Sequence, residues 1–362
     1  MSNTVDYGIY LGTTNSVMAK VEGEDTVIVP NKEGMNHTFS AVHIDKKGKI
    51  HVGRRAKNQL ESDPENSYSE FKLSMGQDKL FEFKRSGIIM RPEELSAEIL
   101  KSLRKNALQR YNEDIRSVVI AVPATFNLAE NYATKKAAEL AGFTDCTLIT
   151  EPVAAAFAYD YEKSKERKLW LIYDLGGGTF NGAIIRLQDG ALEVLEHVGD
   201  RALGGKLVDW DIVNKILVPK VIEEFNLTDF QRSNKKYIKS FAKLKAAAEQ
   251  AKIELSKEEE AEIYIENLLD GEFEYSLTKN DLREIMKPYI SRSVNLCRKA
   301  LNNGNLKDSD ITNIILVGES SLNPIVQGAL KEEFEIPLKF SIDPVTVVAR
   351  GAALYAGTKL KT

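Results

Sequence analysis

The residues with the clearest chemical potential are three glycines and a threonine that follow a short apolar segment. Residues 169–173 are apolar, Asp174 and Leu175 come next, and residues 176–179 are Gly-Gly-Gly-Thr. An apolar run that ends in an acid and glycines predicts a buried strand followed by a tight turn. Glycines at such a turn let backbone N–H groups approach an anion, and the threonine adds a hydroxyl donor. The segment favours a phosphate-binding turn, although a glycine-rich hairpin without a ligand would have the same residues.

A second segment near the start of the chain repeats this plan. Residues 7–11 form a mostly apolar run that ends in Leu-Gly, and residues 13–16 are Thr-Thr-Asn-Ser. The two Leu-Gly pairs, at 11–12 and 175–176, lie 164 residues apart. This spacing is too long for a solenoid repeat and suits a duplicated domain whose halves face each other. Two opposed hairpins of this kind would bind a polyphosphate from both sides.

Two charged residues outside these hairpins are candidates for chemistry. Lys72 follows an apolar residue in the segment 71–76, where one solvated lysine among many is the ordinary interpretation. Glu151 ends a predicted strand at 146–151, at the edge where open α/β sheets bind their ligands. An acid that is favoured by the dipole of the helix that follows would explain Glu151 equally well.

Two further glycine-containing loops are candidates for contacts to a nucleotide. Gly204 and Gly205 precede a predicted helix at 208–225, and a loop that leads into a helix N-terminus can contact phosphate. Residues 318–321 are Gly-Glu-Ser-Ser and follow a predicted strand at 311–317, which suggests contacts to a base or a ribose.

The predicted helix at 234–256 has two distinct faces. Its apolar positions step by three and four residues and predict a core face. Lys245, Glu249, Lys252 and Ser256 follow the opposite face with the same spacing. Solvated surface is the usual explanation of such a polar stripe.

Composition limits the class of protein. The chain has 362 residues, of which 43% are hydrophobic and 28% charged, as in ordinary globular proteins with room for two lobes. A net charge of −4 argues against nucleic acid as a partner. The two cysteines, Cys146 and Cys297, have no metal-ligand spacing, and the start of the chain has no signal-peptide pattern. No apolar run reaches the roughly 18 residues of a membrane helix, so we expect a cytoplasmic protein.

Strand and helix patterns alternate along most of the chain, which predicts an α/β fold. A charged run at 163–168 marks the predicted boundary between lobe I (1–168) and lobe II (169–362). Inserted subdomains are predicted at about 37–112 in lobe I and about 206–286 in lobe II. Helices are predicted at 92–111, 127–141, 153–161, 208–225, 234–256, 279–301, 324–334 and 347–356.

Five segments, in this order, resemble motifs of the seventy-kilodalton heat-shock (DnaK-type) chaperones. They are Leu-Gly-Thr-Thr-Asn-Ser at 11–16, Glu-Pro-x-Ala-Ala-Ala at 151–156, Asp-Leu-Gly-Gly-Gly-Thr-Phe at 174–180, Ala-Lys-Ile-Glu-Leu-Ser at 251–256 and Val-Gly-x-Ser-Ser at 317–321. The resemblance covers essentially the whole chain, as the nucleotide-binding domain alone. It implies the actin-like (ribonuclease-H-like, duplicated) ATPase fold, with two lobes around a nucleotide cleft. A C-terminal helix at about 345–358 would pack back near lobe I.

The resemblance also implies a role for each matching residue. The phosphate loops would be Gly12, Thr13, Thr14 and Asn15, then Gly176, Gly177, Gly178 and Thr179, with Gly204 and Gly205 as further phosphate contacts. The adenosine pocket would be formed by Glu249, Lys252, Ser256, Gly318 and Ser320. Lys72 would position the γ-phosphate or the attacking water, and Glu151 would lie near the magnesium shell. These residues would position ATP and stabilise charge during an in-line phosphoryl transfer, with Mg²⁺ bridging the phosphates.

The chain departs from the family pattern at the expected metal site. Of three aspartates that normally project into it, only Asp174 remains, and it would hold the metal through water. Tyr10 occupies the place of the first and Asn181 the place of the third. Mg²⁺ and K⁺ need anionic oxygens or waters held by them, whereas a phenol with a pKa of about 10 and an amide are neutral at pH 7.

Other departures affect the base pocket and the coupling to partners. Leu322 replaces an arginine that lies against adenine, Glu319 replaces a glycine, and Asn131 replaces an arginine that relays the nucleotide state. Residues 208–211 lengthen the stretch after Gly205. The resemblance implies a C-terminal peptide-binding domain beyond position 362, a J-type co-chaperone and a nucleotide exchange factor as partners.

We therefore expect binding of ATP and ADP with slow hydrolysis. Loss of one electrostatic partner in a phosphoryl-transfer site lowers the rate by about 10²-fold or more. One alternative is a nucleotide-sensing scaffold that does not hydrolyse ATP and signals through lobe closure. Another is a small-molecule kinase on the same superfold, because a fold does not determine a function. A P-loop is excluded, since its Gly-x-x-x-x-Gly-Lys-Ser/Thr pattern does not occur.

Overall fold

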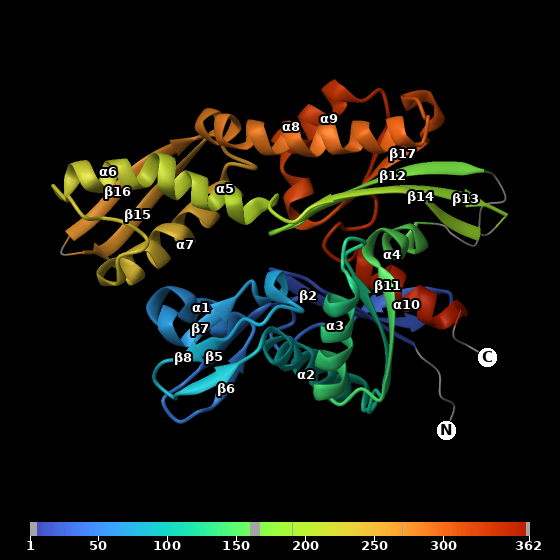
Figure 1. Ribbon diagram of the computed structural model, residues 1–362, viewed down its shortest axis with the longest axis horizontal. Helices are drawn as coiled ribbons and strands as arrows, with labels where there is room; N and C mark the ends of the chain where they lie inside the picture. Colours follow the sequence, from blue (N-terminus) through green and yellow to red (C-terminus); the bar gives the residue numbers. More distant parts are fainter. Residues whose placement is uncertain (1–5, 160–166, 190, 270, 360–362) are drawn as a thin grey trace.

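The computed structural model of the protein describes residues 6–159, 167–189, 191–269 and 271–359. Two mixed sheets lie on either side of a central helical layer, and a smaller α/β region projects from each half (Figure 1). Residues 163–166 of the predicted lobe boundary and the last two positions of the helix predicted at 153–161 lie outside the described residues. We keep lobe I (1–168) and lobe II (169–362) as a proposed division of the chain.

The first sheet has the strand order β11-β10-β1-β2-β3, with the short strand β4 paired to β2. Strand β1 is antiparallel to β2 and parallel to β10, which is in turn parallel to β11. The bounds are β1 Tyr7–Leu11, β2 Asn15–Glu22, β3 Asp25–Ile28, β4 Thr38–Phe39, β10 Ser117–Val122 and β11 Asp145–Thr150.

The second sheet repeats this arrangement in the order β14-β13-β12-β17-β18. Strand β12 is antiparallel to β13 and parallel to β17, which is parallel to β18. The bounds are β12 Lys168–Leu175, β13 Phe180–Gln188, β14 Ala191–Asp200, β17 Asn313–Val317 and β18 Leu338–Lys339. Equal strand order around β1 and β12 confirms the duplicated α/β fold. The two glycine turns follow the two equivalent strands.

The helices α4 (Glu151–Ala158) and α10 (Val347–Lys359) form the layer between the sheets. Their alanines share one apolar cluster with Val119 of β10 and with Ile172 of β12. Strand β12 is buried along nearly its whole length, as its continuous apolar sequence predicts for a strand covered on both faces. Helix α10 also contacts β1 and β2 of the first sheet.

The outer faces of the sheets are covered by long helices. Helix α2 (Pro92–Tyr111) and helix α3 (Leu128–Leu140) cover the first sheet, and α8 (Lys279–Asn303) and α9 (Pro324–Glu333) cover the second. Helix α3 begins with reciprocal caps, in which Asn127 Oδ1 accepts from Glu130 N at 3.0 Å and Glu130 Oε2 accepts from Asn127 N at 2.7 Å.

The region after β4 contains α1 (Arg54–Ser62) and two small sheets. Their strands are β5 Ala41–Ile44, β6 Ile50–Val52, β7 Ser67–Ser69, β8 Phe81–Phe83 and β9 Ile88–Met90, in the orders β6-β5-β7 and β8-β9. The strand-and-turn pattern of this region did not predict α1. Ala56 and Leu60 are its only apolar residues, and so short and polar a segment resembles a surface loop in sequence.

The corresponding region of lobe II contains three helices and a hairpin. The bounds are α5 Gly205–Ile212, α6 Val218–Glu224, α7 Ile238–Glu254, β15 Glu260–Leu268 and β16 Gly271–Thr278. The helix predicted at 208–225 begins earlier, at Gly205, and a π-helical segment at Val213–Leu217 divides it. Helices α1 and α7 contact each other, so the two projecting regions lie side by side (Figure 1).

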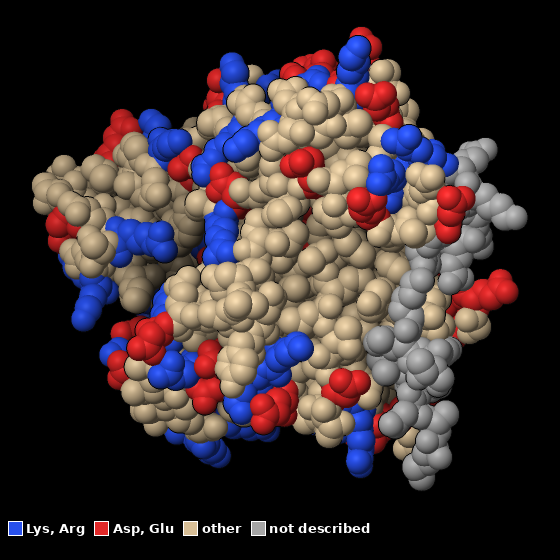
Figure 2. All heavy atoms as spheres, turned by 45° about the vertical axis from the view of Figure 1, so that its right-hand side comes forward, with Lys and Arg blue, Asp and Glu red and all other residues tan. Residues whose placement is uncertain are grey.

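The molecular surface carries both signs of charge. On the face that Figure 2 turns forward, Lys and Arg side chains alternate with Asp and Glu around uncharged areas. No continuous basic area covers that face, in keeping with the net charge of −4.

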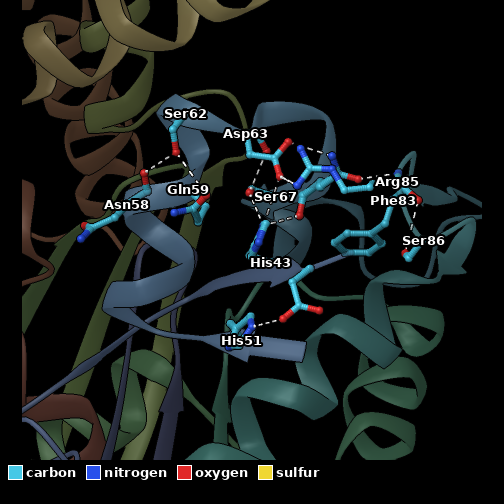
Figure 3. Close-up of polar contacts among 12 residues, drawn as sticks. His43, His51, Asn58, Gln59, Ser62, Asp63, Ser67, Phe83, Arg85 and Ser86 are labelled. Atoms are coloured by element: carbon cyan, nitrogen blue, oxygen red, sulfur yellow. Dashed lines mark hydrogen bonds and ion pairs between the residues drawn. The ribbon is translucent and has the colours of Figure 1, made fainter. Parts of the chain in front are cut away.

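Two stacked histidines lie on the neighbouring strands β5 and β6. The rings of His43 and His51 are 5.8 Å apart between centroids, and the two residues are paired in register. Figure 3 shows His43 directed toward Ser67 and Asp63, with Nδ1 of His43 2.9 Å from the carbonyl oxygen of Asn66. Burial lowers the pKa of His43, and the hydrogen bond to the carbonyl oxygen of Asn66 and the charge of Asp63 oppose this only in part.

This depressed pKa predicts a loss of stability in mild acid. The unfolded chain, with a histidine pKa near 6.5, binds the proton more readily than the folded chain. The free energy of unfolding is therefore expected to fall as the pH drops below about 6.5. Urea unfolding from pH 8 to pH 5 measures this slope. His43→Asn should reduce the slope by up to about 1.4 kcal/mol per pH unit. His197→Asn, on the exposed side of β14, should leave it unchanged.

The packing of α10 predicts a second stability effect. A Cβ atom on Gly351 of α10 would lie 1.6 Å from the carbonyl oxygen of Ala154 in α4. Gly351→Ala must separate two helices of the central layer and should cost about 3 kcal/mol or more. Gly328 in α9 has no atom within 4 Å of the equivalent point, so Gly328→Ala should be neutral or slightly stabilising. Urea unfolding midpoints compare the two, and an unchanged midpoint for Gly351→Ala would contradict this packing.

Candidate functional site

A cavity of about 240 Å³ lies between the two lobes and is lined by both glycine turns. Of the residues predicted to bind nucleotide, the following line it: Thr13, Thr14, Asn15, Gly176, Gly177, Gly204, Gly205, Glu249, Lys252, Ser256, Gly318 and Ser320. Tyr10 lines the cavity as well. The tertiary fold thus brings together segments from five separate parts of the chain, and their individual binding roles stay predictions.

Three glycine-containing loops meet at one end of this cavity. The backbone N–H of Gly205 donates to the carbonyl oxygen of Gly176 at 3.0 Å, and Ser320 Oγ donates to the same oxygen at 3.1 Å. A Cβ atom on Gly204 would lie 2.6 Å from the backbone nitrogen of Gly178. Gly318 has φ +82°, and a Cβ there would lie 2.5 Å from the carbonyl oxygen of Leu175. Side chains at these positions would separate the loops, so glycine is required for the close approach.

Three of the predicted loop residues lie outside the cavity lining and make contacts within the turns. The carbonyl oxygen of Thr179 accepts from the N–H of Gly176 at 3.1 Å and closes the second turn. A Cβ on Gly12 would lie 2.1 Å from the carbonyl oxygen of Asn15, and one on Gly178 would lie 2.9 Å from the side chain of Leu73. None of the three is among the lining residues.

A buried ionic cluster lies beneath the first turn. Lys72 Nζ donates to Glu151 Oε1 at 2.8 Å, and the two residues are only 8% and 2% exposed. The ammonium group also lies 5.3 Å from the centroid of the Tyr10 ring. Burial, together with the charge of Glu151, raises the pKa of Asp174 well above its usual range. Burial likewise raises the pKa of Tyr10, which keeps the phenol neutral.

This donor set does not fit a magnesium ion. Among the described residues, no group of three His, Cys, Asp or Glu side chains is placed to hold a metal. Glu151 is engaged by Lys72, and burial with the nearby charge of Glu151 disfavours the charged form of Asp174 by raising its pKa. The amide of Asn181 is buried and has no hydrogen-bond partner in the part of the chain that is described. Mg²⁺ requires anionic oxygens that keep its waters in place, and these residues do not supply them.

Another part of the cavity wall combines polar residues of α7 with apolar residues of α8. Lys252 Nζ donates to the carbonyl oxygen of Gly205 at 3.0 Å and forms an ion pair with Asp209. Lys57 of α1 donates to Glu249 at 2.5 Å and joins the two lobes. Met286 and Ile290 supply an apolar wall. Such a mixture suits a flat base and a sugar with hydroxyl groups.

A family model described as Hsp70 protein matches residues 6–361. The chain belongs to the Hsp70 family. The family carries the actin-like ATPase fold, and this match confirms the resemblance to its nucleotide-binding domain. Membership of this family supports a chaperone ATPase-type domain and implies that the domain binds a nucleotide. Within the described ranges of this Hsp70-family chain, no helix is both long and apolar enough to cross a membrane.

Three residues of this Hsp70 chain that we expect to differ from the family pattern, Glu319, Leu322 and Asn131, lie in different parts of the structure. Asn15 Nδ2 donates to Glu319 Oε2 at 2.9 Å and links the lobes across the cavity. Leu322 lines the cavity and is 38% exposed. Asn131 lies on α3, away from the lining residues, and its Oδ1 is buried without a partner among the described residues.

Three charged residues of the site were not predicted from the sequence. Lys206 and Asp209 line the cavity, and Glu70 forms ion pairs with Lys206 at 3.1 Å and with Lys245 at 2.5 Å. Burial opposes ionisation of Glu70, but the two lysines lower its pKa to about 2. The position of Lys206 directly after Gly205 was the available signal. Nothing in the local sequence connected it to Glu70, since the contact spans the two lobes.

The glycine contacts predict unequal effects of two similar substitutions. A Cβ on Gly204 meets backbone atoms at 2.6–2.7 Å, whereas the atom nearest to a Cβ on Gly176 is at 3.6 Å. Gly204→Ala is expected to cost about 1–3 kcal/mol of stability, because backbone cannot move aside as a side chain can. Gly176→Ala should cost less than about 1 kcal/mol. Urea unfolding curves of the two variants provide the comparison, and equal midpoints would contradict the described loop contact.

Proposed function

We propose that this Hsp70-family chain binds ATP and ADP in the cavity between the lobes and hydrolyses ATP slowly. The observation that carries the proposal is the buried Lys72–Glu151 ion pair, with the neutral residues Tyr10 and Asn181 where the resemblance leads us to expect acids. Backbone loops and the α7 side chains remain as nucleotide contacts. Asp174 and Glu151 are the acids that remain there, and Glu151 is already paired with Lys72.

The ion pair explains why the remaining charged groups do not compensate for the missing acids. To contact a phosphate, Lys72 must either share its ammonium group between the phosphate and Glu151 or leave Glu151, with which it is nearly fully buried. Breaking a buried pair costs about 3–5 kcal/mol, because a charge is left without a partner. The ring of Tyr10 lies over the same ammonium group and adds a steric barrier. Both features lower the population of a catalytically competent arrangement.

Single-turnover hydrolysis of radiolabelled ATP tests the proposal. The double variant Tyr10→Asp, Asn181→Asp restores two carboxylates and should raise the rate by about 10²-fold or more in the presence of Mg²⁺. Tyr10→Phe retains the ring and should hydrolyse ATP as slowly as the unchanged protein. The proposal fails if the unchanged protein already hydrolyses ATP as fast as the double variant.

The same assay separates the alternative of a non-hydrolysing nucleotide sensor. The neutral metal-site residues favour this alternative as well, and it predicts saturable ATP binding with no release of phosphate above the buffer rate. The expected partners of the slow ATPase are a peptide-binding domain, a J-type co-chaperone and a nucleotide exchange factor. Asn131 in place of the relaying arginine argues for weak stimulation by the co-chaperone.

A reducing, cytoplasmic location also belongs to the proposal. Cys146 and Cys297 are free thiols in the structure. Burial raises the pKa of each to about 12, which keeps the thiols protonated and unreactive.

A further inference from the structure

Two lysines line the cavity among the described residues, and they differ in how they are held. Lys252 is an ion-pair partner of the buried Asp209, and its ammonium group also donates to the carbonyl oxygen of Gly205. Within the described part of the chain, the ion-pair partner of Lys206 is Glu70, at 3.1 Å. Glu70 has a second and closer cation, Lys245, at 2.5 Å. Glu70 can therefore release Lys206 and remain paired.

Lys206 is located where the phosphate-binding turns meet. Its backbone N–H donates to the carbonyl oxygen of Gly177 at 2.8 Å. Its Cε lies 3.6 Å from the point that a Cβ of Gly177 would occupy, and Thr14 Oγ1 lies 2.2 Å from the same point. The lysine from lobe II and the hydroxyl group from lobe I therefore both lie beside Gly177, close to the same point of the turn.

The hydroxyl group beside this lysine has no partner within the protein. Thr14 Oγ1 is buried and makes no hydrogen bond among the described residues. An unsatisfied buried hydroxyl is costly, so the arrangement favours a ligand that accepts its proton. A phosphate oxygen next to Lys206 would accept from both groups, with a charge-assisted hydrogen bond from the ammonium.

We propose that Lys206 is a phosphate ligand of this chain and supplies the positive charge that a bound divalent cation would otherwise bring to the phosphates. Glu70 is its resting counter-ion, and nucleotide phosphate displaces that carboxylate from Lys206. This inference rests on the proposed binding of adenine nucleotide. It adds that ADP and ATP bind without a divalent cation, in agreement with the poor fit of magnesium to the residues around Asp174.

Calorimetric titration of the whole chain with ADP and with adenosine, in EDTA and in Mg²⁺, tests the inference. The affinity of the unchanged protein for ADP should differ by less than about 3-fold between EDTA and Mg²⁺. Lys206→Met should lower the affinity for ADP by about 10-fold or more and change that for adenosine by less than about 2-fold, since adenosine has no phosphate. Glu70→Gln removes the competing carboxylate and should raise the affinity for ADP.

Lys220→Met is the matched control, because this lysine of α6 is exposed and pairs with Glu223 on its own helix. It should leave the affinities for both ligands unchanged. The inference is overturned if Lys206→Met affects ADP and adenosine equally or not at all, or if the unchanged protein loses ADP binding in EDTA. Failure of the unchanged protein to bind ADP or adenosine under either condition would instead refute the proposed function.

Discussion

The structure depends on the close packing of small residues in the layer between its two sheets. Gly8 of β1 and Gly351 of α10 leave no room for a Cβ atom, because the nearest atoms would lie at 2.1 Å and 1.6 Å. Alanines of α4 and α10 fill the rest of this layer. Side chains this small hold the two sheets close together, and β1 and β12 then direct their glycine turns into one cavity. Any change in this spacing would move the turns relative to each other.

Charge in the cavity is balanced by contacts that run between the lobes. Lys57 pairs with Glu249, Glu70 pairs with two lysines of lobe II, and Asn15 donates to Glu319. Arg201 of lobe II also pairs with Glu130 of α3, at 2.6 Å. Several of these pairs are partly exposed, so each contributes modestly to stability. Their position matters more than their strength, since a ligand that enters between the lobes must rearrange some of them.

The buried cluster around Lys72 differs from these contacts in kind. Its ion pair with Glu151 is shielded from water, and a phenol ring and an amide occupy the places of two expected acids. Such a cluster stabilises one arrangement of its own charges and leaves little capacity to bind a further cation. In the function that we propose, an Hsp70-family domain with this cluster would retain nucleotide as a ligand through its loops and would accelerate phosphoryl transfer only weakly. Lys206 offers a separate positive charge on the cavity side of the turns.

Local sequence patterns were enough to predict the duplicated strand-turn plan, most helices and the segments that form the cavity. Apolar runs that end in glycine are local signals, so the turns after β1 and β12 were predictable from residues 7–16 and 169–181. The helix α1 was missed, because its short and mostly polar sequence resembles that of a surface loop. Only the tertiary structure decided that Lys72 pairs with Glu151 and that Glu70 contacts Lys206. These partners are 79 and 136 residues apart in sequence, and long-range ion pairs leave no local pattern.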